Sequence, residues 1–129
     1  MSSSVRAGLS LMASAAFLCG CQRLNHEQTI ALDEGEIRSV EIDAPTRDQT
    51  VTVRVTAGSP VDVFIVLERE EEATKEALSL QKPPNTQLAG KLKVQDATLE
   101  AAIPAKNRFA VLLSGARTKT DVKLRITGR

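Results

Sequence analysis

A strict alternation of β-branched and polar residues is the feature that most restricts how this chain can fold. Val51, Val53 and Val55 alternate with polar side chains, so an extended strand would bury the valines on one face. Residues 61–67 are instead apolar on both faces apart from Asp62, which favours a central strand. Weaker or similar alternation marks residues 30–32, 40–42, 92–94, 97–103, 109–113 and 122–126.

These segments amount to about eight short strands separated by turn-forming residues. The turn signals lie at residues 33–36, 44–45, 58–60, 104–107 and 114–115. Many short strands at such spacing favour an antiparallel sheet structure over a parallel α/β fold. We therefore expect an all-β fold, a small jelly-roll-like antiparallel β-sandwich, in one domain over residues 29–129.

One segment departs from the two-residue period and predicts a short helix near residues 69–80. Ala73, Ala77 and Leu80 recur at helical spacing, and Glu71 with Lys75 forms a favourable pair one turn apart. The acidic residues of this segment are interpreted as a solvated helix start, where the helix dipole favours negative charge.

The N-terminus has the organisation of a signal peptide. Residues 1–8 carry a positive charge at Arg6, residues 9–18 are apolar and uncharged, and small residues with a cysteine follow. Ten apolar residues are too few to span a hydrocarbon core of ~30 Å, which needs about 20 in a helix. We expect residues 1–20 to be a signal peptide and not a membrane-spanning segment.

The end of this segment, Leu18-Cys19-Gly20-Cys21, resembles the lipobox of bacterial lipoproteins. The resemblance implies cleavage between Gly20 and Cys21, followed by attachment of lipid (diacylglyceryl and a further acyl chain such as palmitate) to Cys21. In a Gram-negative host, Gln22 after the cysteine implies sorting to the outer membrane, with the domain facing the periplasm.

Other readings of the two cysteines are weaker. A tetrahedral zinc site needs four ligands, and only His26 lies near the pair. A disulfide between Cys19 and Cys21 would enclose one residue and constrain almost nothing. A secreted protein cleaved elsewhere remains an alternative. Residues 21–28 are expected to be the lipidated cysteine and a short polar tether, with His26 as a solvated residue of that tether.

Composition disfavours two classes of partner. Aromatic residues make up 2% of the chain, with no Trp or Tyr, so stacking platforms for bases or sugars are not expected. The formal net charge is +1, and removal of the signal peptide with Arg6 leaves 16 basic and 16 acidic residues. A nucleic-acid-binding domain normally carries a basic excess, so we expect no nucleic-acid partner.

The sequence offers no set of residues typical of catalysis. The single histidine lies in the expected tether, which leaves a Ser or Cys nucleophile without its usual base. Phosphate-binding glycine loops and zinc-protease motifs are missing from the sequence, and we expect no enzyme activity, cofactor or metal. Asp62 is expected to point outward or to pair with Arg54, since a buried carboxylate is costly unless it is paired. A calcium ligand is the alternative, but calcium takes six to eight oxygens and no loop supplies them.

The mature part also resembles small secreted β-sandwich modules. The stretches VTVRVTAGSPVDVFIVL (51–67) and NRFAVLLSGARTKTDVKLRITG (107–128) look like pre-peptidase C-terminal domains and GOLD-like sandwiches. The resemblance implies a module that binds or supports other molecules and performs no chemistry itself.

These observations favour a lipid-anchored envelope protein with a non-enzymatic adaptor or binding domain, whose partner is an envelope protein or polysaccharide. One alternative is an envelope hydrolase with converging acids such as Asp62 and Asp121. Another is a purely structural lipoprotein that packs through its strand edges or the helix.

Overall fold

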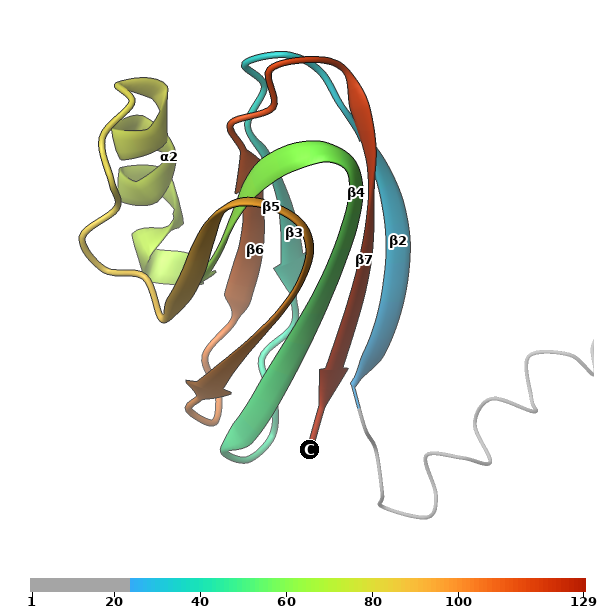
Figure 1. Ribbon diagram of the computed structural model, residues 1–129. Coiled ribbons are helices and arrows are strands. Elements are labelled where there is room, and N and C mark those ends of the chain that lie inside the picture. Colours follow the sequence, from blue (N-terminus) through green and yellow to red (C-terminus); the bar gives the residue numbers. More distant parts are fainter. Residues whose placement is uncertain (1–23) are drawn as a thin grey trace, which may run out of the picture.

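The computed structural model describes residues 24–129, which form an antiparallel β-sandwich with one short helix (Figure 1). The expected all-β architecture is therefore confirmed. A 3-10 turn, η1 (Glu68–Glu70), leads into the helix α2 (Glu71–Ser79), and both lie between the two longest strands. The strands are β2 (Asn25–Leu32), β3 (Arg38–Ile42), β4 (Gln49–Leu67), β5 (Ala89–Ile103), β6 (Phe109–Ser114) and β7 (Thr120–Gly128).

The strand β4 belongs to both layers of the sandwich. The hydrogen-bonded order is β2-β7-β4-β6-β3, and β5 lies along the other side of β4. The first half of β4 pairs with β7 and its second half pairs with β6, while β5 follows β4 through both halves. A strand that changes sheets through a bend or bulge forms a corner of a sandwich. The two layers thus share the bent pair β4 and β5.

This sharing explains why six strands replace the eight that were expected. The turn signal at residues 58–60 is a bend inside β4, and the register between β4 and β5 shifts between Thr56 and Val61. The expected segments 92–94 and 97–103 likewise join into the single strand β5. Bulges of this kind add local twist and let a long strand change direction without ending.

Between the two layers lies one aliphatic core. The alternating valines of β4 point into it, as expected, together with inward residues of all the other strands. The residues that fill it completely, with no exposed surface, are Leu32, Val51, Val53, Val55, Val61, Val63, Ile65, Val111, Leu113, Val122, Leu124 and Ile126.

A second and smaller apolar cluster lies outside one layer, beneath α2. Val66 of β4 and Ala110 and Leu112 of β6 form it, and Ile37 and Leu78 pack against it. Figure 1 shows that α2 stands on the side of the molecule away from β2 and β7. The outer surface of the β6 layer is thus covered, whereas that of the β7 layer is not.

The expected helix is confirmed, but the side of it that is buried is not the apolar side from which it was predicted. Glu71 and Thr74 are buried, whereas Ala73 is exposed and Leu80 keeps 59% of its surface exposed. The interpretation of the acidic run as wholly solvated is therefore wrong at Glu71. The reason lies in the neighbouring strand β3, which presents polar side chains to this turn of the helix.

The strand β2 begins earlier than the sequence suggested. It starts at Asn25, so residues 25–28 belong to the sheet and not to a tether. His26 is paired with Ile126 in the ladder, and its Nε2 lies 2.9 Å from Oε1 of Gln28. Gly20 and Cys21, the expected cleavage and lipidation residues, lie outside the described residues. From Leu24 to Arg129, the chain contains no helix with the length and apolar character needed to cross a bilayer.

Candidate functional site

An uncovered polar surface lies on the outer side of β2, β7, the first half of β4 and the end of β5. The registers of these four strands place their outward residues in three rows. We call this surface the polar face. Its rows, each read across β2, β7, β4 and β5, are Asn25, Thr127, Thr52 and Glu100; then Glu27, Arg125, Arg54 and Thr98; then Thr29, Lys123, Thr56 and Asp96.

All twelve residues are exposed or half-buried, and none is apolar or aromatic. The cations occupy the two central strands, whereas the acids lie on the outer strands β2 and β5. Arg54 and Arg125 stand directly opposite each other in the ladder. Like charges at opposed positions of an antiparallel pair are destabilising. The centre of the polar face therefore concentrates positive charge at a cost to the fold.

The three rows hold three cations and three acids, so their charges balance, but only two of the cations form ion pairs with these acids. Arg54 lies 3.8 Å from Asp96, and Lys123 lies 3.9 Å from Glu27. All four side chains are largely exposed, and ion pairs of this kind contribute about 0–1 kcal/mol. Arg125 forms no ion pair with any other residue in the stretch 24–129. Arg125 is therefore available to a ligand, and Arg54 is held only by a weak, exposed ion pair.

One end of the polar face opens into a shallow hollow of about 440 Å³. The first row of the face lines it, together with Leu24, Thr50, Gly128 and Arg129. The hollow forms where the chain enters β2 and leaves β7, since Gly128 donates a backbone hydrogen bond to Leu24. The polar face thus extends to the corner of the domain from which the N-terminal segment departs.

A second cluster of titratable residues lies beneath α2. Glu71 is only 4% exposed, and its Oε2 lies 3.0 Å from Nζ of Lys75. Burial raises the pKa of Glu71, but hydrogen bonds with Lys75, Ser39 and Glu41 outweigh it and hold the pKa below its ordinary value. The hydrogen bond with Glu71 raises the pKa of Glu41. The hydrogen bond with the Glu71 carboxylate also raises the pKa of Lys75. These contacts connect α2 to β3.

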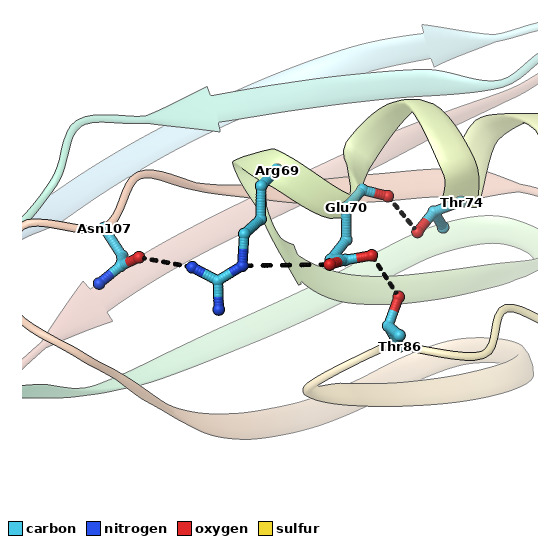
Figure 2. A network of polar contacts seen from close by, with 5 residues as sticks. All are labelled: Arg69, Glu70, Thr74, Thr86 and Asn107. Carbon is cyan, nitrogen blue, oxygen red and sulfur yellow. Dashed lines mark hydrogen bonds and ion pairs between the residues drawn. The ribbon is translucent and has the colours of Figure 1, made fainter.

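The start of the helix is also connected to two neighbouring loops (Figure 2). The Glu70 carboxylate lies 4.0 Å from Arg69 and accepts a hydrogen bond of 3.0 Å from Thr86. Arg69 donates a 3.1 Å bond to Asn107, and Thr74 donates to the Glu70 carbonyl at 2.7 Å. These contacts hold the start of the helix against the two loops, so we assign the network a structural role.

Asp62, the polar residue within the apolar part of β4, contacts the backbone of β5 and not a basic side chain. Its Oδ1 accepts a 2.8 Å hydrogen bond from the amide of Lys93, a residue with a φ of 54° at the irregular part of β5. Of the two alternatives expected for Asp62, the pairing with Arg54 is wrong, because Arg54 lies across from Thr98 and approaches Asp96. The outward alternative fits, since Asp62 is the only residue of 61–67 that is not buried.

The fold does not bring Asp62 and Asp121 together. Asp62 stands opposite Ser114 of β6, whereas Asp121 stands opposite Ala31 of β2, in the other layer. Within residues 24–129 there is also no group of three or more His, Cys, Asp or Glu residues suited to a metal ion. The acids named in the sequence as a candidate pair are thus separate surface and structural residues.

Comparison with known proteins gives information on the fold. No family model matches the chain, and no curated protein matches it. Among solved structures it is similar to the pre-peptidase C-terminal domain of a collagenase from Bacillus anthracis, with a TM-score of 0.57, 8% identity, and coverage of 80% of this chain and 89% of that one. It is also similar to the Yersinia pseudotuberculosis-derived mitogen, with a TM-score of 0.57, 5% identity, and coverage of 82% and 86%. At these identities the likeness concerns the fold alone, and it agrees with the resemblance to pre-peptidase C-terminal domains noted from the sequence.

Proposed function

We propose that the protein is a lipid-anchored component of a bacterial cell envelope, whose β-sandwich is a non-enzymatic binding or adaptor domain. The anchor is Cys21, and signal-peptide cleavage falls between Gly20 and Cys21. The partner is a polysaccharide or protein of the envelope, and the domain faces the periplasm from the outer membrane.

The observation that carries the binding role is the uncovered polar face. A sheet surface that serves only the fold does not require two opposed arginines at its centre, because that arrangement weakens the pairing of β4 with β7. Its exposed cations, acids and hydroxyls supply hydrogen-bond donors and acceptors to a partner. The two similar structures, both β-domains, are compatible with this role.

The position of the expected anchor supports a function close to the membrane. The strand β2 begins at Asn25, four residues after Cys21. Four residues reach at most about 14 Å at ~3.3–3.6 Å each. Because Asn25 is itself part of the polar face, lipid at Cys21 would keep that face within a short distance of the bilayer.

Metabolic labelling tests the anchor. Cells that express the full chain are grown with a clickable palmitate analogue, and the protein is compared with its Cys21→Ser variant. We expect label on the wild type and none on the variant, with Cys19→Ser as the matched control that keeps its label. Equal labelling of wild type and Cys21→Ser would overturn the assignment of Cys21.

Site-specific photo-crosslinking in intact envelopes tests the binding role. A photoreactive residue is placed at Thr98 in the polar face, and in a second variant at Glu76 on the exposed side of α2. We expect a discrete adduct from Thr98 and none from Glu76. Identical adduct patterns from both positions, or no adduct from Thr98, would contradict a binding role for the polar face.

A further inference from the structure

Three basic residues, Lys123, Arg125 and Arg129, lie along the outward side of the last strand and its end, with Thr127 between the two arginines. Lys123 and Arg125 occupy successive outward positions of β7, and Arg129 continues the same alternation beyond its end. Arg129 is bonded through its backbone to Thr50, which keeps it in line with the ladder. At ~3.4 Å per residue, these cations span about 20 Å. Arg54 widens the line at its middle.

The acids on either side limit the shape of a partner that could use this line. Glu27 lies on the β2 side, Asp96 and Glu100 lie on the β5 side, and Asp121 occupies the outward position of β7 before Lys123, where the cationic line ends. Neighbouring strands are about 4.7–4.9 Å apart, so the cationic line is about two strands wide. A broad anionic surface would meet the acids as well as the cations, whereas a single anionic chain along β7 would meet the cations.

The side chains also indicate the chemistry of that chain. Two opposed guanidinium groups can each hold a carboxylate or phosphate through paired hydrogen bonds. Thr29, Thr52, Thr56, Thr98 and Thr127 surround them with hydroxyls that both donate and accept hydrogen bonds. A peptide backbone could add only at the free outer edges of β2 and β5, away from the cations, because the two central strands that carry the cations are paired on each side. A hydroxyl-rich anionic chain fits these groups better than a peptide.

We propose that the polar face binds a linear anionic polysaccharide, laid along β7, with Arg54 and Arg125 holding one of its acidic groups. This inference rests on the proposed function and names the class of its ligand. A bound anion would reduce the repulsion between the two arginines. Anion binding would therefore explain why Arg54 and Arg125 stand opposite each other. Binding through such contacts is expected to weaken as the salt concentration rises.

Titration of the full chain, purified in a non-ionic detergent, with polygalacturonate tests the proposal. Dextran serves as the uncharged polysaccharide and poly-L-glutamate as the anionic peptide. We expect the protein to bind polygalacturonate at 50 mM NaCl, more weakly at 200 mM, and more tightly than either control polymer. The Arg54→Thr/Arg125→Thr double variant is expected to lose affinity by about tenfold or more.

Two controls separate recognition from folding and from total charge. Arg117→Thr/Arg38→Thr removes two exposed arginines outside the polar face and should change the affinity by less than twofold. The double variant in the face should melt no lower than wild type, because it removes a repulsive pair. Unaltered affinity of the double variant, equal loss in the control, or tighter binding of poly-L-glutamate or dextran would each overturn the proposal. Failure of polymer binding with intact labelling at Cys21 and a face-specific crosslink would refute only the ligand class.

Discussion

The two halves of β4 differ in whether their outward side chains are covered or exposed to solvent. Residues 51–56 alternate between buried side chains and half-buried or exposed ones, whereas in residues 61–67 every side chain except Asp62 is buried. Both halves send valines into the same core, and the second half adds Ile65 and Leu67. The difference lies on the outer side, where Arg54 of the first half faces solvent and Val66 of the second half lies against the α2 side of the sheet.

The outer surface beneath α2 thus contributes to stability, whereas the polar face is open to a partner. The outer side of the second half gains stability by covering apolar side chains with α2. The outer side of the first half has no such cover and carries Arg54, directly opposite Arg125 of β7. Within β4, the outer side of residues 61–67 is therefore packed, and the outer side of residues 51–56 is open to solvent.

The largest expected effect comes from placing a charge on the outer side of each half. Val66→Lys introduces a buried ammonium without a partner and should cost more than about 4 kcal/mol, which unfolds much of the protein. Thr52→Lys, on the exposed polar face opposite Glu100, should change stability by less than about 0.5 kcal/mol. Chemical denaturation of both variants measures the contrast, and similar losses would show that the outer sides of the two halves do not differ.

The junction between the halves is tested at Gly115, which has a φ of +76° and lies against Asp62. A Cβ on Gly115 would clash with the carboxylate of Asp62, so Gly115→Ala should cost about 1–3 kcal/mol. Gly35 also has a positive φ, of +72°, but open space around it. Gly35→Ala should therefore cost only the backbone strain of about 1 kcal/mol. Equal melting temperatures for the two variants would argue against close contact with Asp62.

The covering helix is tested at its buried carboxylate. Glu71→Ala removes the buried carboxylate that pairs with Lys75 and interacts with Ser39 and Glu41 of β3, and should cost about 1–2 kcal/mol. The exposed neighbour Glu72 is the matched control, and Glu72→Ala should stay within about 0.5 kcal/mol. Hydrogen exchange should report faster opening of α2 in the Glu71 variant, with β2 and β7 unchanged. Equal acceleration throughout the sheet would show that the helix is not a separately opening element.

The smallest effect is a change in pH dependence at Glu41. The pKa of Glu41 is raised above its ordinary value of 4.5, mainly by its hydrogen bond with Glu71. A raised pKa contributes stability below the ordinary value, and that contribution is lost as the pH rises through the folded value. Glu41→Gln keeps a hydrogen-bond donor and cannot ionise, so its melting temperature should gain on wild type between pH 4 and pH 7. Glu34→Gln in the exposed β2–β3 turn is the control and should follow the pH profile of the wild type. If the melting temperature of Glu41→Gln also runs parallel to that of the wild type, the interaction between Glu41 and Glu71 is contradicted.

The strands could be predicted from the sequence because their inward residues alternate so regularly. Their number could not, because a Gly-Ser-Pro turn signal does not distinguish a chain reversal from a bend within one strand. Here β5 follows β4 around the bend, and only that long-range pairing shows residues 58–60 to be a corner. Residues 25–28 were missed as strand because they are polar on both sides, and their partner β7 lies at the other end of the described chain.

The polar face itself was not predicted, although its residues are visible in the sequence. Arg54 and Arg125 lie far apart in the chain, and strand order alone brings them together. Glu71 was missed because acids at a helix start are usually solvated, while its partner Lys75 could be predicted from their spacing. Local patterns thus gave the inward residues of each strand, and pairing across the sheet determined the composition of its outer surface.

The pairing of the first described strand with the last has a consequence for biosynthesis. The strand β2 finds its only ladder partner in β7, so half of one layer stays open while the chain is being made. Long-range pairing of this kind also makes folding slow, because distant segments must meet before they gain stability. The newly made chain should therefore remain unfolded until β7 has emerged, which leaves its β-rich segments in need of protection from other chains.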